Sequence, residues 1–156
     1  MAGNEDMIKA WPLPVTDAPD DAEFYAAARR GELVMQACSD CGQLRFPPRP
    51  MCPACRSLQR QWRQLAGCGH IWSFTVPHPP LLPAFNDFAP YPVIVVELDD
   101  APHIRLVGNL VADANAAINS VDPKTIRIGE PVRTVFAPMT DDATLIRWMR
   151  SAEGEA

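Results

Sequence analysis

The segment CSDCGQLRFPPRPMCPAC, residues 38–55, decides what kind of fold this chain can adopt. It holds two Cys-x2-Cys pairs, Cys38 with Cys41 and Cys52 with Cys55, with ten residues between the pairs. Two residues between cysteines let a tight turn direct both sulfurs at one ion, and zinc prefers four tetrahedral ligands at about 2.3 Å for thiolate sulfur. Because thiolates fill all four positions, the spacing predicts a structural zinc in a zinc ribbon, with no position open for catalysis.

Composition favours metal ligation over disulfide formation. The 156 residues contain no apolar run of about 18 residues that could cross a membrane and no apolar signal core near the N-terminus. We therefore expect a cytoplasmic protein without a membrane span, and thiols stay reduced in that compartment. A redox role would need one cysteine pair at the start of a helix in a βαβ setting, which the sequence lacks.

The rest of the chain predicts a mainly β fold with one helix in front. Asp20 can cap that helix with Glu23 three residues later, as in a capping box, and Gly31 is a natural end. Gly108 indicates a bend or a close backbone approach. Short apolar stretches bounded by turns predict strands at residues 32–37, 58–65, 71–76, 91–98, 104–111, 132–137 and 145–149.

The strand pattern suits a five-stranded Greek-key barrel of the OB type behind the ribbon. The unbroken apolar run at residues 93–96 predicts burial on both faces of its strand, and the proline-rich residues 77–90 predict no regular structure. The expected organisation is an extended arm at 1–19, helix and zinc ribbon at 20–60, barrel at 61–150 and a tail at 151–156. Whether the arm is disordered or lies on the body or on a partner stays open.

No residue pattern predicts a catalytic site. Cys68, in AGCGHIW, could be a nucleophile assisted by His70 or His78, but nothing in the sequence supplies a third group. A small buried or bulge-lining residue is the preferred interpretation of Cys68. The carboxylates within residues 97–100 suit strand and turn positions rather than acid–base work.

Five motifs occur in an order that resembles the DUF35 family over residues 20–149. They are DAEFYAAARRGEL, QACSDCGQLRFPPRPMCPAC, AGCGHIWSFTVPH, APYPVIVVELDD and IRIGEPVRTVFAP. The resemblance implies a rubredoxin-like zinc ribbon followed by an OB-fold, in an accessory subunit that is not itself an enzyme. It also implies a thiolase-fold partner (an acyltransferase, thiolase or steroid side-chain aldolase) or a hot-dog-fold enoyl-CoA hydratase, and a role in binding or channelling acyl-CoA.

The chain departs from the family pattern at one turn. The usual glycine, basic residue and glycine are Gly67, Cys68 and Gly69 here, so a contact between position 68 and a CoA phosphate is in doubt.

Eight residues are candidate contacts to acyl-CoA or to the partner. They are Arg45, Phe46, Arg49, Trp72, Leu81, Leu82, Phe85 and Phe88. The two arginines suit the phosphates and adenine of CoA, with a solvated turn as the alternative. The apolar side chains of the 77–90 loop could contact a partner, line an acyl passage, or fold over the barrel as core.

A single-stranded nucleic-acid binder is the alternative function. Zinc ribbons and OB barrels also serve that role, and Trp72, Phe74 or Tyr91 could stack on bases. The chain has 14 basic against 19 acidic residues, a net charge of −5, and only the lysines Lys9 and Lys124. Since affinity for nucleic acid comes largely from neutralised phosphates, we expect no nucleic-acid partner.

Overall fold

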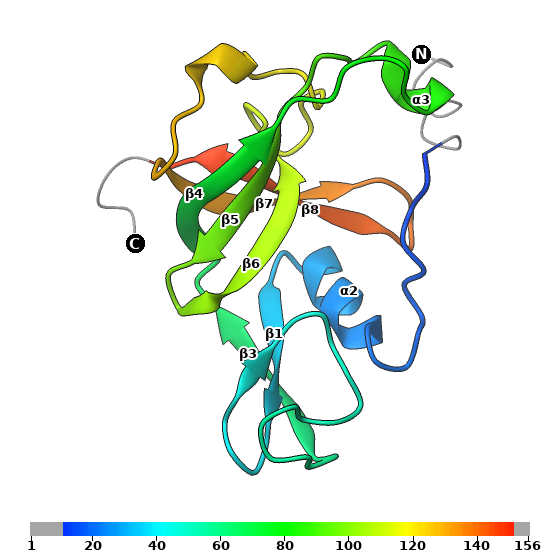
Figure 1. The fold of residues 1–156 in the computed structure, drawn as a ribbon. Coiled ribbons are helices and arrows are strands. Elements are labelled where there is room, and N and C mark those ends of the chain that lie inside the picture. The colour runs from blue at the N-terminus through cyan, green and yellow to red at the C-terminus, as the bar shows by residue number, and fades with distance from the viewer. Residues whose placement is uncertain (1–10, 152–156) are drawn as a thin grey trace.

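The computed structural model describes residues 11–151, which form a small zinc-ribbon sheet below a larger curled sheet (Figure 1). The elements are α2 (Ala22–Arg29), β1 (Leu33–Cys38), β2 (Leu44–Arg45), β3 (Arg60–Leu65), β4 (Cys68–Thr75), α3 (Pro83–Asn86), β5 (Val93–Leu98), β6 (Ala101–Asn109), the 3-10 turn η1 (Pro123–Thr125), β7 (Pro131–Pro138) and β8 (Thr144–Arg150). The ribbon sheet has the order β2-β1-β3, and the larger sheet has the order β6-β5-β4-β7-β8. In residues 11–151 there is no helix with the length and apolar character that a membrane crossing requires.

The larger sheet curls until its two edge strands, β6 and β8, meet at a seam. Leu110 and Trp148 form a parallel bridge there, and the Val111 N–H donates to the Trp148 carbonyl at 2.8 Å. A Cβ at Gly108 would lie 2.9 Å from Trp148 Cδ1 and 3.1 Å from the backbone oxygen of Ile146, so of the two predicted roles of this glycine, a bend or a close backbone approach, the second is confirmed. This closed, mainly antiparallel arrangement confirms the predicted OB-type barrel.

The apolar run in β5 alternates between two faces. Ile94 and Val96 are fully buried, whereas Val93 and Val95 are only partly buried. The predicted burial on both faces of the strand is therefore wrong, because this antiparallel sheet has a core on one side only.

Helix α2 packs between the two sheets, but it is not capped as predicted. Its N-cap is Asp21, which makes no side-chain capping bond, and Asp20 forms an ion pair with Arg60 on β3 instead. A guanidinium offers the Asp20 carboxylate a stronger, charge-assisted partner than a helix N–H. Gly31, at φ +77°, ends the helix as predicted. The apolar face of the helix is buried through Phe24, Ala27 and Ala28.

The described part of the arm lies along the body. The ring of Trp11 lies 5.0 Å from Phe85 and 5.7 Å from Phe88, which belong to the proline-rich loop. That loop includes the short helix α3, so the prediction of no regular structure is wrong for one turn, where Pro83 suits the first helical position. The rest of the predicted arm, residues 1–10, and residues 152–156 of the tail lie outside the described residues.

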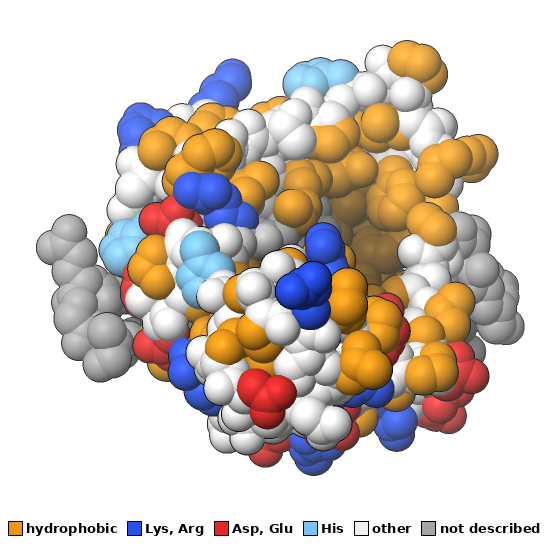
Figure 2. All heavy atoms as spheres, turned by 60° about the horizontal axis from the view of Figure 1, so that its bottom comes forward, with side chains coloured by type: hydrophobic (Ala, Val, Ile, Leu, Met, Phe, Trp, Pro, Cys, Tyr) orange, Lys and Arg blue, Asp and Glu red, His pale blue; other side chains and the backbone are white. Residues whose placement is uncertain are grey.

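One hydrophobic core joins the ribbon to the barrel. Leu33, Met35 and Leu44 of the ribbon belong to the same buried cluster as Ile94 and Trp148 of the barrel. Seen with the ribbon in front, hydrophobic side chains also gather around a hollow in the surface behind it (Figure 2). The division of the chain near residue 60 stays a prediction.

Candidate functional site

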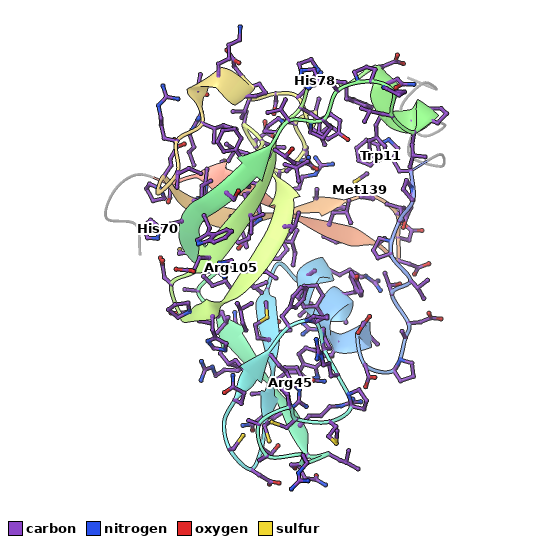
Figure 3. The ribbon with its side chains drawn as sticks, viewed as in Figure 1. Trp11, Arg45, His70, His78, Arg105 and Met139 are labelled. Atoms are coloured by element: carbon purple, nitrogen blue, oxygen red, sulfur yellow. The ribbon has the colours of Figure 1, made fainter. Side chains whose placement is uncertain are left out.

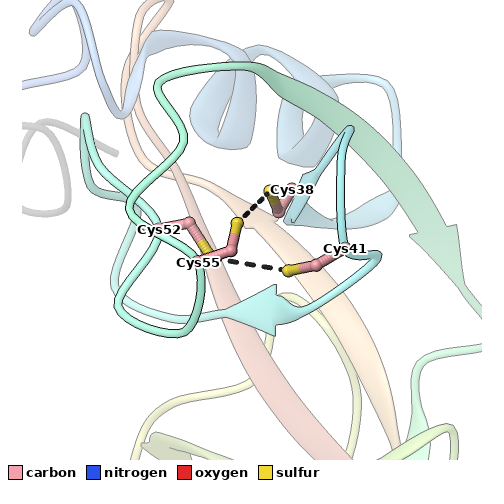
Figure 4. A group of neighbouring side chains, drawn as sticks. All are labelled: Cys38, Cys41, Cys52 and Cys55. Carbon is pink, nitrogen blue, oxygen red and sulfur yellow. Dashed lines mark hydrogen bonds between the residues drawn. The ribbon is translucent and has the colours of Figure 1, made fainter.

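Four cysteine sulfurs converge at the outer end of the ribbon (Figure 4). All four Sγ atoms lie within 4.8 Å of one another, with Cys38 Sγ 3.5 Å from Cys55 Sγ and Cys41 Sγ 3.7 Å from Cys52 Sγ. A tetrahedral zinc with bonds of about 2.3 Å separates its sulfurs by about 3.8 Å. The four cysteines are therefore positioned for one tetrahedral ion.

Two similar turns place these sulfurs. In the first, the Gly42 N–H donates to the Cys38 carbonyl at 3.0 Å; in the second, the Arg56 N–H donates to the Cys52 carbonyl at 2.9 Å. The residue after the second cysteine of each pair has a positive φ, +75° at Gly42 and +64° at Arg56. The first turn uses glycine, whereas the second holds a non-glycine residue in the same left-handed region.

Backbone N–H groups stabilise the thiolate form at the two buried cysteines. The N–H of Cys41 lowers the pKa of Cys38, and the N–H of Cys55 lowers the pKa of Cys52 to about 6. For Cys55, the Ser57 N–H lowers the pKa, but the neighbouring sulfurs, chiefly those of Cys38 and Cys41, and desolvation together outweigh it and raise the pKa to about 12. Four sulfurs this close can all be thiolates only with a cation among them.

Arg45 is buried inside the ribbon rather than exposed beside it. Only 5 % of its surface is accessible, its Nε donates to Gln36 Oε1, and its Nη2 donates to the Arg49 carbonyl at 3.3 Å. Gln36 Oε1 also accepts from the Arg49 N–H at 2.9 Å. Arg45 therefore fastens the loop between the cysteine pairs, and only the exposed side chain of Arg49 is left to meet a ligand.

An apolar groove lies beside the barrel seam, between α2, β6 and β8. This β6–β8 groove has a volume of about 520 Å³. Its lining comprises Pro12, Leu13, Pro14, Phe24, Tyr25, Phe46, Arg105, Leu106, Val107, Thr144, Leu145 and Ile146. Phe46 contributes from the ribbon and contacts Phe24, with 5.4 Å between ring centroids. Of this set, only Phe46 is a contact predicted from the sequence, because the groove joins segments that are distant in the chain.

Trp72 lies next to this groove on the outer face of the barrel. The Arg105 guanidinium lies 4.2 Å from the centre of the Trp72 ring, and Arg105 Nη2 donates to Glu97 Oε2 at 2.7 Å. Trp72 keeps 53 % of its surface exposed. Arg105 also lines the β6–β8 groove, so it connects the exposed Trp72 ring to the groove that Phe46 lines.

The four loop candidates lie at the other end of the molecule, near Trp11 and α3, far from Arg45 in Figure 3. Phe85 and Phe88 are partly buried against Trp11, and Phe85 also lies 6.1 Å from the ring of Tyr91. Leu81 is partly buried, whereas Leu82 is 60 % exposed. The eight candidate contacts therefore do not form a single site.

The histidines considered as helpers of Cys68 lie on the surface. His70 Nδ1 lies 2.8 Å from Asp99 Oδ1, and His78 Nδ1 lies 2.8 Å from the Val76 carbonyl. Cys68 itself is partly buried, and in the register of the sheet it lies opposite Arg133 of β7.

Comparisons with known proteins match both halves of this arrangement. The family model described as the rubredoxin-like zinc ribbon domain of ChsH2 matches residues 26–59, and that of its C-terminal OB-fold domain matches residues 62–137. A "DUF35 domain-containing scaffold protein" of Methanothermobacter thermautotrophicus is 31% identical over 115 residues, which cover 73% of this chain and 78% of the relative. The chain belongs to the DUF35 family.

Two further comparisons relate this DUF35 chain to enzyme complexes by name. A "Probable enoyl-CoA hydratase alpha subunit" of Thermomonospora curvata is 42% identical over 113 residues, 72% of this chain, and the chain spans only 32% of that relative's length. The solved structure "Ltp2-ChsH2(DUF35) aldolase" is similar with a TM-score of 0.75 and 34% identity, covering 89% of this chain and 100% of that chain. A DUF35 protein from Sulfolobus solfataricus, at 12% identity and a TM-score of 0.55, shares the fold.

Proposed function

We propose that this DUF35 chain is a non-catalytic accessory subunit that binds a thiolase-fold enzyme subunit and helps to hold or channel its acyl-CoA. The observation that carries the proposal is the similarity to the whole DUF35 chain of the Ltp2–ChsH2 aldolase, at 34% identity and a TM-score of 0.75. Relatives named as scaffold proteins support the non-catalytic role. Relatives named as hydratase alpha subunits support a second partner class, the hot-dog-fold enoyl-CoA hydratases.

In this proposal the four cysteines hold one zinc ion that stabilises the fold. Zinc supplies no reaction chemistry there, because four thiolates complete its coordination. It would fix Cys38 at the end of β1 relative to the loop that carries Cys52, and so fix the position of Phe46 between them. The ribbon wall of the β6–β8 groove would therefore depend on the metal.

The β6–β8 groove is the proposed place for the acyl part of the thioester. Its walls are largely apolar, and a volume of about 520 Å³ is within the range of small-molecule pockets. Arg105 at the groove and Arg49 on the ribbon are the cations proposed to meet CoA phosphates. Arg105 would exchange its bond to Glu97 for a phosphate.

Co-expression with a thiolase-fold subunit, and separately with a hot-dog-fold hydratase subunit, tests the function. We expect a stable complex on size-exclusion chromatography, with acyl-CoA turnover that needs the partner. Turnover by the purified chain alone would refute the accessory role, as would the absence of a complex with either partner class. A salt-dependent shift of a single-stranded oligonucleotide would favour the nucleic-acid alternative instead.

Two matched variants test the groove. Val107, 65 % exposed, lines the groove, whereas Ile128, 61 % exposed, lies outside it. We expect Val107→Asp to weaken acyl-CoA binding to the complex about tenfold or more, because the carboxylate must be desolvated beside the acyl chain. Ile128→Asp should leave binding unchanged. Equal effects of the two variants would exclude the groove while leaving the accessory role intact.

A further inference from the structure

A second pocket lies where the arm and the α3 loop meet the β7–β8 hairpin. This Arg147 pocket has a volume of about 290 Å³ and shares no lining residue with the β6–β8 groove. Phe88, Ile118 and Ala137 give it apolar walls, and Trp11 and Arg147 also line it. Figure 3 shows Trp11 on the same side of the molecule as Met139, a further lining residue.

Arg147 is a buried cation with no anionic partner among residues 11–151. Only 6 % of its surface is accessible, its Nη1 donates to the Ala116 carbonyl at 2.9 Å, and its Nη2 lies 3.6 Å from Met139 Sδ. Its Nε is buried with no hydrogen-bond partner. The ion pairs of residues 11–151 involve other side chains and leave Arg147 unpaired. A buried charge without a counter-charge is strongly destabilising.

A second donor in the lining of the pocket is also unsatisfied. The indole Nε1 of Trp11 is buried and has no hydrogen-bond partner. Most buried donors in folded proteins have a partner. Gln36 Nε2, Arg45 Nη1 and Trp148 Nε1 also lack one among residues 11–151, so it is the charge of Arg147, at the wall of a pocket, that indicates an anionic acceptor here. Water would satisfy the N–H groups but would not neutralise the charge of Arg147.

We propose that the Arg147 pocket binds a carboxylate carried on a small apolar group. A carboxylate offers two acceptor oxygens to a guanidinium in a matching planar geometry. A thioether is a weak acceptor, so Arg147 loses little when Nη2 leaves Met139 for such a ligand. The aromatic and alanine walls suit a compact aryl or alkyl group beside the carboxylate. A carboxylate of the chain itself, Glu5 or Asp6, has the same chemistry as a free acid, and the test separates these sources.

Benzoate is the probe, added to the zinc-loaded full chain labelled with ¹⁵N. We expect a saturable shift of the Trp11 indole N–H resonance and a rise in the unfolding temperature. Benzamide, which has the same shape without the charge, should bind about tenfold more weakly or worse. Resonances of the other tryptophans serve as internal controls.

Variants assign the binding to Arg147. Arg147→Met removes the charge at similar length and should abolish benzoate binding, while Arg147→Lys should retain part of it. Arg133→Met, at an exposed arginine on β7, is the matched control and should bind as the parent does. Removing a buried, unpaired charge does not by itself unfold a protein. The circular dichroism spectrum of Arg147→Met should therefore match that of the parent.

The double variant Glu5→Gln/Asp6→Asn separates the two sources of the carboxylate. Unchanged benzoate affinity assigns the pocket to a free acid, whereas a tenfold gain assigns it to the chain's own N-terminal carboxylates. The proposal is overturned if benzamide binds as well as benzoate or if Arg147→Met binds like the parent. It is also overturned if neither the parent nor the double variant shows a saturable shift.

Discussion

Two glycines of the barrel allow its strands to approach closely, and replacing each with alanine should cost different amounts of stability. A Cβ at Gly69 would lie 2.3 Å from the Glu97 carbonyl oxygen and 2.7 Å from Val96 Cγ1. At Gly108 the nearest atoms are Trp148 Cδ1 at 2.9 Å and Nε1 at 3.0 Å. The obstacle at Gly69 is the backbone of the neighbouring strand at 2.3 Å, whereas at Gly108 the contacts are longer, with the buried Trp148 ring and with the Ile146 carbonyl oxygen at 3.1 Å, and need a shift of only a few tenths of an ångström.

Overpacking a well-packed core lowers the free energy of unfolding by about 1–3 kcal/mol. Replacing a glycine raises it by about 0.4–1 kcal/mol, because the unfolded chain then has less conformational entropy. We therefore expect Gly69→Ala, at the upper end of the overpacking range, to lose about 2 kcal/mol and Gly108→Ala about 1 kcal/mol. Because 1 kcal/mol shifts the unfolding temperature by about 2–4 °C at this size, Gly69→Ala should lower it by about 4–8 °C.

Guanidinium unfolding followed by circular dichroism measures both free energies, with zinc in excess so that every sample has an equally loaded ribbon. Asn119→Ala, at an exposed loop residue, is the control and should change the free energy of unfolding by less than about 0.5 kcal/mol. A cost below about 1 kcal/mol for Gly69→Ala, or a larger cost for Gly108→Ala, would refute the inferred strand contacts.

Three further substitutions test the metal centre, the α3 loop and the ribbon interior. Cys52→Ser should reduce the zinc content found by elemental analysis well below one ion per chain, since a serine hydroxyl is not ionised at neutral pH, whereas Cys68→Ser should retain the ion. Phe85→Ser should lower the free energy of unfolding by about 2 kcal/mol, because it removes the contact between the Phe85 ring and the arm. Leu82→Ser, at an exposed residue, should lower it by less than about 0.5 kcal/mol. Guanidinium unfolding measures both, and equal losses would show that Phe85 is not packed. Gln36→Leu removes an acceptor shared by the buried Arg45 side chain and the partly buried Arg49 N–H, and should cost about 2 kcal/mol in the same assay. An unchanged midpoint would mean that those donors find other partners.

Local sequence predicted much of this protein because the relevant interactions are local. Two ligands separated by two residues within a tight turn determine their own geometry, so the spacing predicted how Cys38 and Cys41 lie. Strands were predicted because turn residues bound short apolar stretches, and Gly108 indicated close packing before any partner strand was known. Helix α2 was predicted correctly with its end at Gly31. The predicted cap at Asp20 was wrong, because the partner of Asp20 is Arg60, which lies 40 residues away on β3.

What the sequence alone determined is the set of four thiolates, the order of the strands along the chain and the family. Only the tertiary structure determined that Arg45 is buried while Trp72 is exposed, that the β6–β8 groove exists, and that Arg147 is left without a counter-charge. The physical reason is that burial and pairing depend on which distant segments the barrel closure brings together. A sequence pattern can predict a strand, but the neighbours of its side chains follow from packing across the whole molecule.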